Sequence, residues 1–429
     1  MRCSYACGSS QHAFSRRQFL GGAAAGTLGL FGLGGMVQPG AAAELKRQQK
    51  RVLLVWLNGG VSQLETWDPK PGTDTGGPFQ AIQTSVPGLH ISELMPYTAQ
   101  QMHRLALIRG INTKEDDHGL GNVLMHTGRR QDPAMPYPQL GSAMAKLLGT
   151  RDNPLPGYIT ITPGGGGGTG KSDAAFLGPR YASVHLGDGQ APANLARPAT
   201  LSEAADKRRD AVRQRLNQHF MSMRRTAETE AYTESYDQAA LLMARREVFD
   251  IGKESPQAVE RYGKHDFGRH CLMARRLLEA GVTFVKVTHT NYDTHHENFD
   301  FHIQQLGEFD RPFATLIDDL AERGMLESTL VIVMSEFGRT PRINHLYGRD
   351  HWSKAWSIVV GGCGIKGGAL VGKTNANGTA VIDREVNGGH LFHTYFRAVG
   401  LDPHKKYYVN EQPIPMTDPA ASAIEEVLA

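Results

Sequence analysis

The sequence predicts an α/β fold built on an open sheet, and three observations support this. The chain has 429 residues, enough for one large α/β domain or two smaller ones. Short apolar runs rich in β-branched residues stop at glycines or polar residues, as buried parallel strands do. Amphipathic stretches of helical length separate these runs. The succession of helix, apolar strand and polar loop is typical of an open α/β sheet.

The expected elements can be placed along the chain. The predicted strands, each followed by a polar or Gly-rich loop, are 51–57, 104–111, 281–287, 328–334 and 355–362. Two amphipathic helical patterns, 268–280 and 309–325, precede the third and fourth strands. From Leu201 to about Ile251 the chain is rich in Ala, Arg, Glu, Gln and Met, which predicts long surface helices inserted into the domain.

A glycine-rich stretch, TPGGGGGTGKSD at 162–173, formally satisfies the spacing of a phosphate-binding P-loop. However, no clear amphipathic helix opens after Asp173, and five consecutive glycines are typical of a flexible loop. We therefore interpret this stretch as a loop and do not expect nucleotide hydrolysis.

The first 43 residues have the pattern of a twin-arginine export signal. Arg16 and Arg17 precede a Gly/Ala/Leu stretch, and Ala41 to Ala43 offer small residues to a signal peptidase. The alternative, a membrane anchor, is weaker because the run from Gly21 to Val37 is too short and too weakly apolar for a stable span. We expect a single mature domain, 44–429, in the periplasm or cell envelope. Since this route carries folded proteins, it favours a cofactor-dependent protein.

Removal of the signal changes the charge and the cysteine content. The chain has 46 basic and 43 acidic residues, and the signal's only charged residues are three arginines, so the mature part is balanced. This excludes an electrostatic case for nucleic-acid binding. Only Cys271 and Cys363 remain, which allows one disulfide but no disulfide framework.

Polar side chains that can bind metals or catalyse reactions follow four of the predicted strands. Ligands of α/β sheets bind beyond the carboxyl ends of the strands, so these side chains are expected to meet there. A lone histidine at the end of a strand more often has a structural role. Polar groups of this kind at the ends of four strands are harder to explain in that way. Mixed imidazole and carboxylate groups suit zinc, manganese or iron. The groups are Asn58, Ser62, Gln63, Asp116, Asp117, His118, His289, Asp293, His295, His296, Glu336, Asp350 and His351.

Several motifs together resemble a known family. They are LNGGVSQLETWDPKP, DHGLGNVLMHTGRR, RYGKHDFGRHCLMARRLLEAGVTFVKV, YDTHHENF, MSEFGRTPRIN and GRDHW, which span most of residues 51–405. They resemble an uncharacterised family of exported bacterial proteins, the domain of unknown function 1501. That family is similar to the alkaline phosphatase and sulfatase superfamily. The resemblance implies a doubly wound, mostly parallel α/β sheet flanked by helices, with divalent metal at the strand ends and hydrolysis of phosphate or sulfate esters.

The resemblance also matches individual residues of this chain with functional positions of the superfamily. Several of these residues differ from the superfamily pattern. Aligning the Thr-Gly-Arg ending at 127–129 places His118 where sulfatases keep their nucleophile. The first metal-binding aspartate of the superfamily is matched by Asn58. Its Ser-Asp-His-Gly element is matched by 335–338, where phenylalanine replaces a histidine ligand. The resemblance therefore implies a remodelled site.

We expect this site to hold one divalent metal, zinc, manganese or iron. An imidazole at position 118 can ligate a metal, act as a general base or form a phospho-histidine, and we favour the first two. Arg129 and Arg339 are candidates for gripping an anionic substrate, although Arg339 could instead pair with a neighbouring carboxylate. We expect Asn58 and Asp350 to support the ligands from behind. The expected ligands are His118, Asp293, His295, Glu336 and His351.

Three classes of function are consistent with these residues. The first is an exported metal-dependent hydrolase acting on an anionic small-molecule or glycan ester. The second is a degenerate relative that binds an anionic glycan or a partner protein without turnover, supported by the absence of the usual nucleophile. The third is a metal-dependent isomerase or lyase on the same scaffold. Metal analysis of the folded protein separates the second class from the others.

Export can be tested through the paired arginines. Replacing Arg16 and Arg17 by lysine should trap the precursor in the cytoplasm, because the export receptor reads the two guanidinium groups and not charge alone. The measurement is cell fractionation of wild type and variant. Unchanged export of the Lys-Lys variant would point to the general secretion route.

Overall fold

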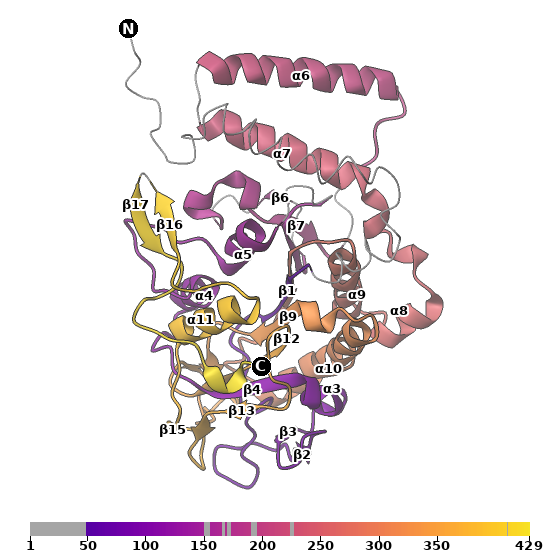
Figure 1. Ribbon diagram of the computed structural model, residues 1–429. Coiled ribbons are helices and arrows are strands. Elements are labelled where there is room, and N and C mark those ends of the chain that lie inside the picture. The colour runs from indigo at the N-terminus through magenta and orange to yellow at the C-terminus, as the bar shows by residue number, and fades with distance from the viewer. Residues whose placement is uncertain are drawn as a thin grey trace, which may run out of the picture.

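A nine-stranded sheet forms the centre of the protein in the computed structural model, which describes residues 49–149, 155–164, 168–169, 173–189, 195–223, 227–409 and 411–429. The strand order is β13-β4-β12-β9-β1-β8-β5-β7-β6 (Figure 1). All the strands expected from the sequence belong to this sheet. Its strands are β1 (Arg51–Leu57), β4 (Leu105–Ile111), β5 (Tyr158–Thr162), β6 (Gly168–Thr169), β7 (Val184–Gly187), β8 (Phe284–His289), β9 (Thr329–Met334), β12 (Trp356–Gly362) and β13 (Leu370–Val371).

Strand direction decides where the loops emerge. β1 runs parallel to β8 and β9, and β5 runs parallel to β8 and β7. β12 is antiparallel to both β9 and β4, so β4 points the same way as β9. The carboxyl ends of β4, β9, β1, β8 and β5 therefore lie along one edge. The mostly parallel sheet confirms the predicted fold class.

Helices cover both faces of the sheet. Successive side chains of β1 point to opposite faces, so Leu53 and Val55 enter one apolar core while Leu54 and Trp56 enter the other. The sheet is thus doubly wound, as expected. The helices of the first core are α3 (Pro96–Gln101), α9 (Asp266–Glu279) and α10 (Asn298–Glu322), and those of the second are α4 (His118–Thr127), α5 (Leu140–Leu148) and α11 (Gly388–Ala398).

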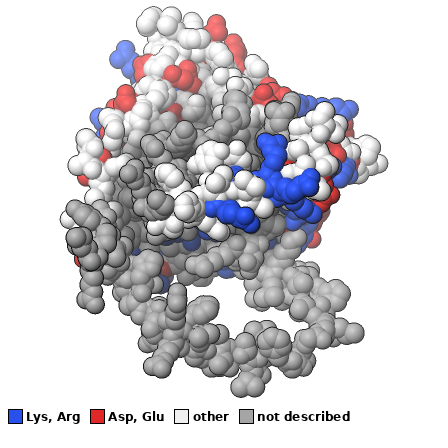
Figure 2. Space-filling view, turned by 90° about the horizontal axis from the view of Figure 1, so that it is seen from above, with Lys and Arg blue, Asp and Glu red and all other residues white. Residues whose placement is uncertain are grey.

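The segment expected to form inserted helices contains α6 (Glu203–Met223) and α7 (Ala227–Ala244). Both run across one end of the molecule, with α6 on the outside (Figure 1). α7 packs against the turn Pro179–Tyr181, whereas most described side chains of α6 are exposed. Figure 2 views the molecule from this end and shows both basic and acidic side chains on its surface. The exposure of these helices to solvent accounts for the many charged residues in this segment.

Smaller elements complete the fold, and one of them bears directly on the candidate site. The two-stranded pair β10 (Gly338–Arg339) and β11 (His351–Trp352) sets Arg339 opposite His351. α8 (Pro256–Tyr262) precedes α9. The other pairs are β2 (Ala81–Gln83) with β3 (His90–Ser92), β14 (Lys373–Thr374) with β15 (Val381–Asp383), and β16 (Lys406–Val409) with β17 (Gln412–Pro415).

Two features expected from the sequence involve residues that the structure does not describe. The predicted export signal, 1–43, and part of the glycine-rich stretch 162–173 lie outside the described residues. Within the described ranges, no helix combines the length and the apolar character that a membrane crossing requires.

The two cysteines of the described residues do not pair. Both Cys271 and Cys363 are free and buried. Cys271 belongs to the core beneath α9, and Cys363 belongs to the core on the other side of the sheet. The disulfide that the composition allowed is therefore absent, because the sheet separates the two side chains. Burial also raises the pKa of the Cys271 thiol, which keeps it protonated.

Thiol reactivity tests this separation. The mature protein, kept without reductant, should react with a thiol reagent at neither cysteine while folded and at both Cys271 and Cys363 after denaturation. The expectation follows from their exposures of 0% and 1%. Absorbance with a chromogenic disulfide reagent measures it. If denatured, unreduced protein shows no free thiol, the separation is wrong.

Candidate metal centre

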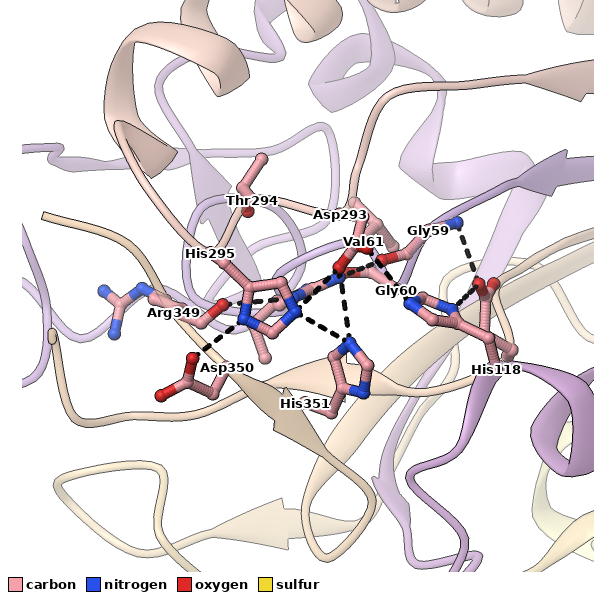
Figure 3. A network of polar contacts seen from close by, with 12 residues as sticks. Gly59, Gly60, Val61, His118, Asp293, Thr294, His295, Arg349, Asp350 and His351 are labelled. Carbon is pink, nitrogen blue, oxygen red and sulfur yellow. Dashed lines mark hydrogen bonds and ion pairs between the residues drawn. The ribbon is translucent and has the colours of Figure 1, made fainter. Parts of the chain in front are cut away.

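Residues from four loops converge at the carboxyl edge of the sheet (Figure 3). His118 opens α4 shortly after β4, Asp293 and His295 follow β8, Glu336 follows β9, and His351 begins β11. These loops meet because their strands point in the same direction. The structure thus brings together residues that lie more than 200 positions apart, as His118 and Glu336 do.

Three histidines of this group are oriented in the same way. In each, the Nδ1 atom faces an oxygen that accepts a hydrogen bond, so Nδ1 carries the proton and Nε2 keeps its lone pair. Histidines that bind metals are typically held by such a second partner. The three contacts are His118 to Glu336 Oε1 at 2.8 Å, His295 to Asp350 Oδ1 at 2.8 Å, and His351 to the backbone oxygen of Asp116 at 2.7 Å.

The three Nε2 atoms are directed at the carboxylate of Asp293. Nε2 of His118 lies 3.2 Å from Oδ2, while Nε2 of His295 and of His351 lie 3.1 and 3.3 Å from Oδ1. The Nε2 atoms of His295 and His351 are only 3.0 Å apart. Two lone pairs facing each other at this distance repel unless a proton or a cation lies between them.

A metal ion fits this arrangement. One ligand atom each from His118, Asp293 and His351 lies within 4.8 Å of the others. The Nε2 atom of His118 is buried and makes no hydrogen bond among the described residues. An orphaned nitrogen beside a carboxylate is the geometry that zinc, manganese or iron would satisfy. His295 is a fourth nitrogen at the rim of this group.

Arg339 fixes the position of Asp293. Its side chain is fully buried, and its guanidinium donates to Asp293 Oδ1 and to the backbone oxygens of Gly59, Gly60 and Arg349. Of the two roles that the sequence left open, the geometry favours pairing with a carboxylate. Gripping a substrate would require donors that are already occupied.

Glu336 takes a different position from the one expected. Its Oε1 accepts hydrogen bonds from His118 Nδ1 and from the backbone of Gly59, and Ser335 Oγ lies 2.9 Å from its Oε2. The side chain is completely buried behind His118. Glu336 therefore orients a histidine and does not itself join the converging ligand atoms. The ring of Phe337 packs 4.8 Å from the ring of His118.

The remaining predicted residues separate into near and distant groups. Asp350 lies behind His295, as the contact above shows. Asn58 is exposed, and its Oδ1 accepts a hydrogen bond from Trp56 Nε1 at 3.1 Å, away from the converging histidines. Arg129 donates to the backbone oxygens of Pro415 and Thr417 at the far end of α4. The structure does not bring Arg129 to the metal centre.

Charges around the centre shift the ionisation of its groups. Burial opposes the ionisation of Asp293, but the hydrogen bond and charge of Arg339 lower its pKa to about 2. The hydrogen bond to Glu336 raises the pKa of His118, whereas burial lowers the pKa of His351. Asp293 is therefore a carboxylate throughout the physiological range, ready to bind a cation.

One polar pair close to the centre was not expected from the sequence. Lys286 Nζ lies 2.7 Å from His126 Nε2, on the face of the sheet covered by α4. The sequence signal was a lysine inside an otherwise apolar strand, FVKVTH.

Comparison with known proteins identifies the family. The profile described as "Protein of unknown function (DUF1501)" matches residues 49–428. The chain belongs to this family. No curated protein matches the chain.

Solved structures show only a remote likeness to this DUF1501 protein. A lipoteichoic acid synthase from Listeria monocytogenes is 9% identical, with 90% of this chain and 78% of that one covered at a TM-score of 0.37. Alkaline phosphatase from the Antarctic bacterium TAB5 is 12% identical, with 82% and 99% covered at 0.36. A sulfatase from Pseudoalteromonas sp. is 14% identical, with 92% and 77% covered at 0.37.

The pH dependence of metal binding tests the role of His118. Its folded pKa is raised, so charged His118 stabilises the metal-free fold below pH about 6.5, and this contribution is lost as pH rises through the raised pKa. A metal needs the neutral Nε2, so protonation of His118 should lower the affinity by up to about tenfold per pH unit below that pKa. Competition with a chromophoric chelator measures the affinity.

Glu336→Gln provides the matched comparison. It removes the carboxylate that raises the pKa of His118, so the loss of affinity should begin at a lower pH. An identical pH profile in both proteins would contradict the role given to the His118–Glu336 hydrogen bond.

Proposed function

We propose that this protein is an exported, metal-dependent hydrolase of sulfate or phosphate esters. The observation that carries the proposal is the convergence of three imidazole Nε2 atoms on the Asp293 carboxylate, with every Nδ1 held by an oxygen. In this proposal His118, Asp293 and His351 hold one divalent metal, because their ligand atoms lie mutually close. Catalytic zinc sites commonly use three protein ligands and keep one position open.

The chemistry assigned to the metal is that of a Lewis acid. A divalent ion in such a site polarises an ester oxygen and lowers the pKa of a water molecule that it holds. Imidazole nitrogens with one carboxylate suit zinc, manganese or iron better than calcium, which prefers oxygen ligands.

We assign proton transfer to His295. Its Nδ1 is fixed by Asp350, and its Nε2, beside Nε2 of His351, is placed to accept or return a proton, as in other histidine–carboxylate pairs. The side chain of His295 is 43% exposed, compared with 23% for His351, so it is the histidine nearer to solvent. The hydrogen bond from His295 lowers the pKa of Asp350, which keeps this partner ionised.

The openness of the site bears on the substrate class. The side chains of His118, Asp293 and His295 are between 35% and 47% exposed. A substrate can therefore extend away from the centre over the protein surface, as a glycan ester or another large anionic ester would. Because Arg339 is buried and occupied, recognition of the anion falls mainly to the metal in this proposal.

A second function is favoured by one specific feature. The position of a sulfatase nucleophile carries His118, and a metal-binding histidine is replaced by Phe337, whose ring lies 4.5 Å from that of His351. A protein that binds an anionic glycan or a partner protein without turnover would tolerate both replacements. Metal content and activity together separate the two proposals.

Three alanine variants test the assignment of roles. The mature protein should contain about one equivalent of zinc, manganese or iron. His118→Ala and His351→Ala should lose most of the metal and the activity together. His295→Ala should keep the metal but lose at least about a hundredfold in turnover, the contribution of a positioned proton-transfer group. Elemental analysis and hydrolysis of aryl sulfates and aryl phosphates are the measurements.

His219→Ala is the control, since His219 lies exposed on α6. It should match the wild type in metal content and rate. Protein prepared without chelator and free of transition metal would contradict the proposed centre. A metal-loaded protein that hydrolyses no ester on a broad panel would favour the binding function.

A further inference from the structure

Lys286 is a lysine in the middle of a central strand. It lies on β8, flanked in register by Leu54 of β1 and Thr160 of β5. The side chain is 5.0 Å from the ring centroid of Trp56, under α4, and a part of its surface still reaches solvent. Burial lowers the pKa of Lys286 to about 8, so the side chain is mostly charged at neutral pH.

The one hydrogen-bond partner of Lys286 among the described residues is a neutral histidine. Nδ1 of His126 faces the backbone oxygen of Asn122 at 2.9 Å and therefore carries the ring proton. Its Nε2 then accepts a hydrogen bond from Lys286 Nζ at 2.7 Å. Burial, followed by the charge of Lys286, lowers the pKa of His126 well below its usual range. His126 thus accepts a hydrogen bond but supplies no negative charge.

No described carboxylate forms an ion pair with Lys286. None lies within the 4.0 Å of an ion pair, and the two acidic groups that act on Lys286, Glu336 and Asp173, do so from further away. Glu336 is engaged with His118, and Asp173 accepts from the backbone of Ser183. An ammonium has three donors, of which one is used here. A buried charge without a partner is strongly unfavourable.

The surroundings offer further polar groups. Thr288 lies two residues along the same strand face, and its Oγ1 makes only a long 3.4 Å contact with Thr162. Both hydroxyls can turn towards another acceptor. Trp56 Nε1 donates to Asn58 Oδ1 and is therefore already engaged.

We propose that Lys286, held in place by His126, forms with the hydroxyl of Thr288 a binding site for a small oxyanion such as phosphate, sulfate or a carboxylate. The anion supplies acceptors for the unused ammonium donors and a counter-charge in direct contact with the ammonium. Lys286 precedes the end of β8 by three residues, roughly 10 Å at 3.3 Å per residue, so this site lies below the metal centre. The inference does not depend on the proposed hydrolysis.

Thermal unfolding of the mature, metal-loaded protein tests the site. The probes are sodium phosphate, sulfate and acetate, added to an anion-poor buffer at constant ionic strength. At about a hundred times its dissociation constant, at least one anion should raise Tm by about 3 °C or more. Lys286→Met should abolish this shift. In the anion-poor buffer its Tm should equal or exceed that of the wild type, because an uncompensated charge is removed.

Two further variants locate the anion. Lys354→Met is the matched control, because Lys354 also lies near a tryptophan ring, 5.2 Å from that of Trp352, but on the exposed surface. It should keep the full shift. His351→Ala disrupts the metal centre and should keep the shift as well. A shift that survives in Lys286→Met but disappears in His351→Ala would place the anion at the metal centre and overturn the proposal.

A measurement on the wild-type protein keeps the proposal testable if Lys286→Met does not fold. Reductive methylation of lysines, followed by peptide mass spectrometry, should modify Lys286 less when the stabilising anion is present, while Lys354 should be modified equally. No Tm shift with any of the three anions, or no protection of Lys286, would overturn the proposal.

Discussion

The buried guanidinium of Arg339 is the interaction on which the candidate site depends. It emerges from β10 and binds the segments that follow β1 and β8 and the segment that precedes β11, through Gly59, Gly60, Asp293 and Arg349. Each of these segments is a loop that would otherwise be free to move. Because the guanidinium is planar and its donors are fixed in direction, all of these positions are fixed relative to one another. Asp293 is thereby held where the histidines converge.

A second buried arginine braces the same region. Arg349 donates to Glu65 at 2.7 Å and to the backbone oxygens of Thr75, Thr340 and Pro341. Its neighbour Gly348 lies so close to His295 that an added Cβ would be 1.9 Å from the backbone oxygen of His295. The loop of Asp350 and His351 is therefore packed tightly against the loop of Asp293 and His295. These contacts hold the loops of the candidate metal centre in place from beneath, although its ligand side chains are open to solvent.

This use of arginine has a consequence for anion recognition. Two cationic side chains that the sequence placed near an anionic substrate, Arg129 and Arg339, are engaged with the protein itself. The exposed centre instead combines imidazole nitrogens with a carboxylate, a set of ligands that suits a metal cation. Lys286, on a central strand, has no described carboxylate within ion-pair distance. The structure thus separates the groups suited to a metal from the group suited to an anion.

The sequence by itself indicated an α/β sheet, five of its nine strands, and the residues that meet in the candidate metal centre. Continuous apolar character identifies strands such as RVLLVWL in the sequence, and the parallel arrangement places the carboxyl ends of these strands at one edge of the sheet. Hydrogen-bond partners could not be read in the same way, because they depend on contacts between distant segments. Only the tertiary structure decided that Glu336 stands behind His118, that Arg339 holds Asp293, and that the two cysteines lie on opposite sides of the sheet. Whether a side chain faces a ligand or a neighbouring residue depends on displacements of a few ångströms and on the orientation of the side chain. Residue type and spacing along the sequence do not give either of them.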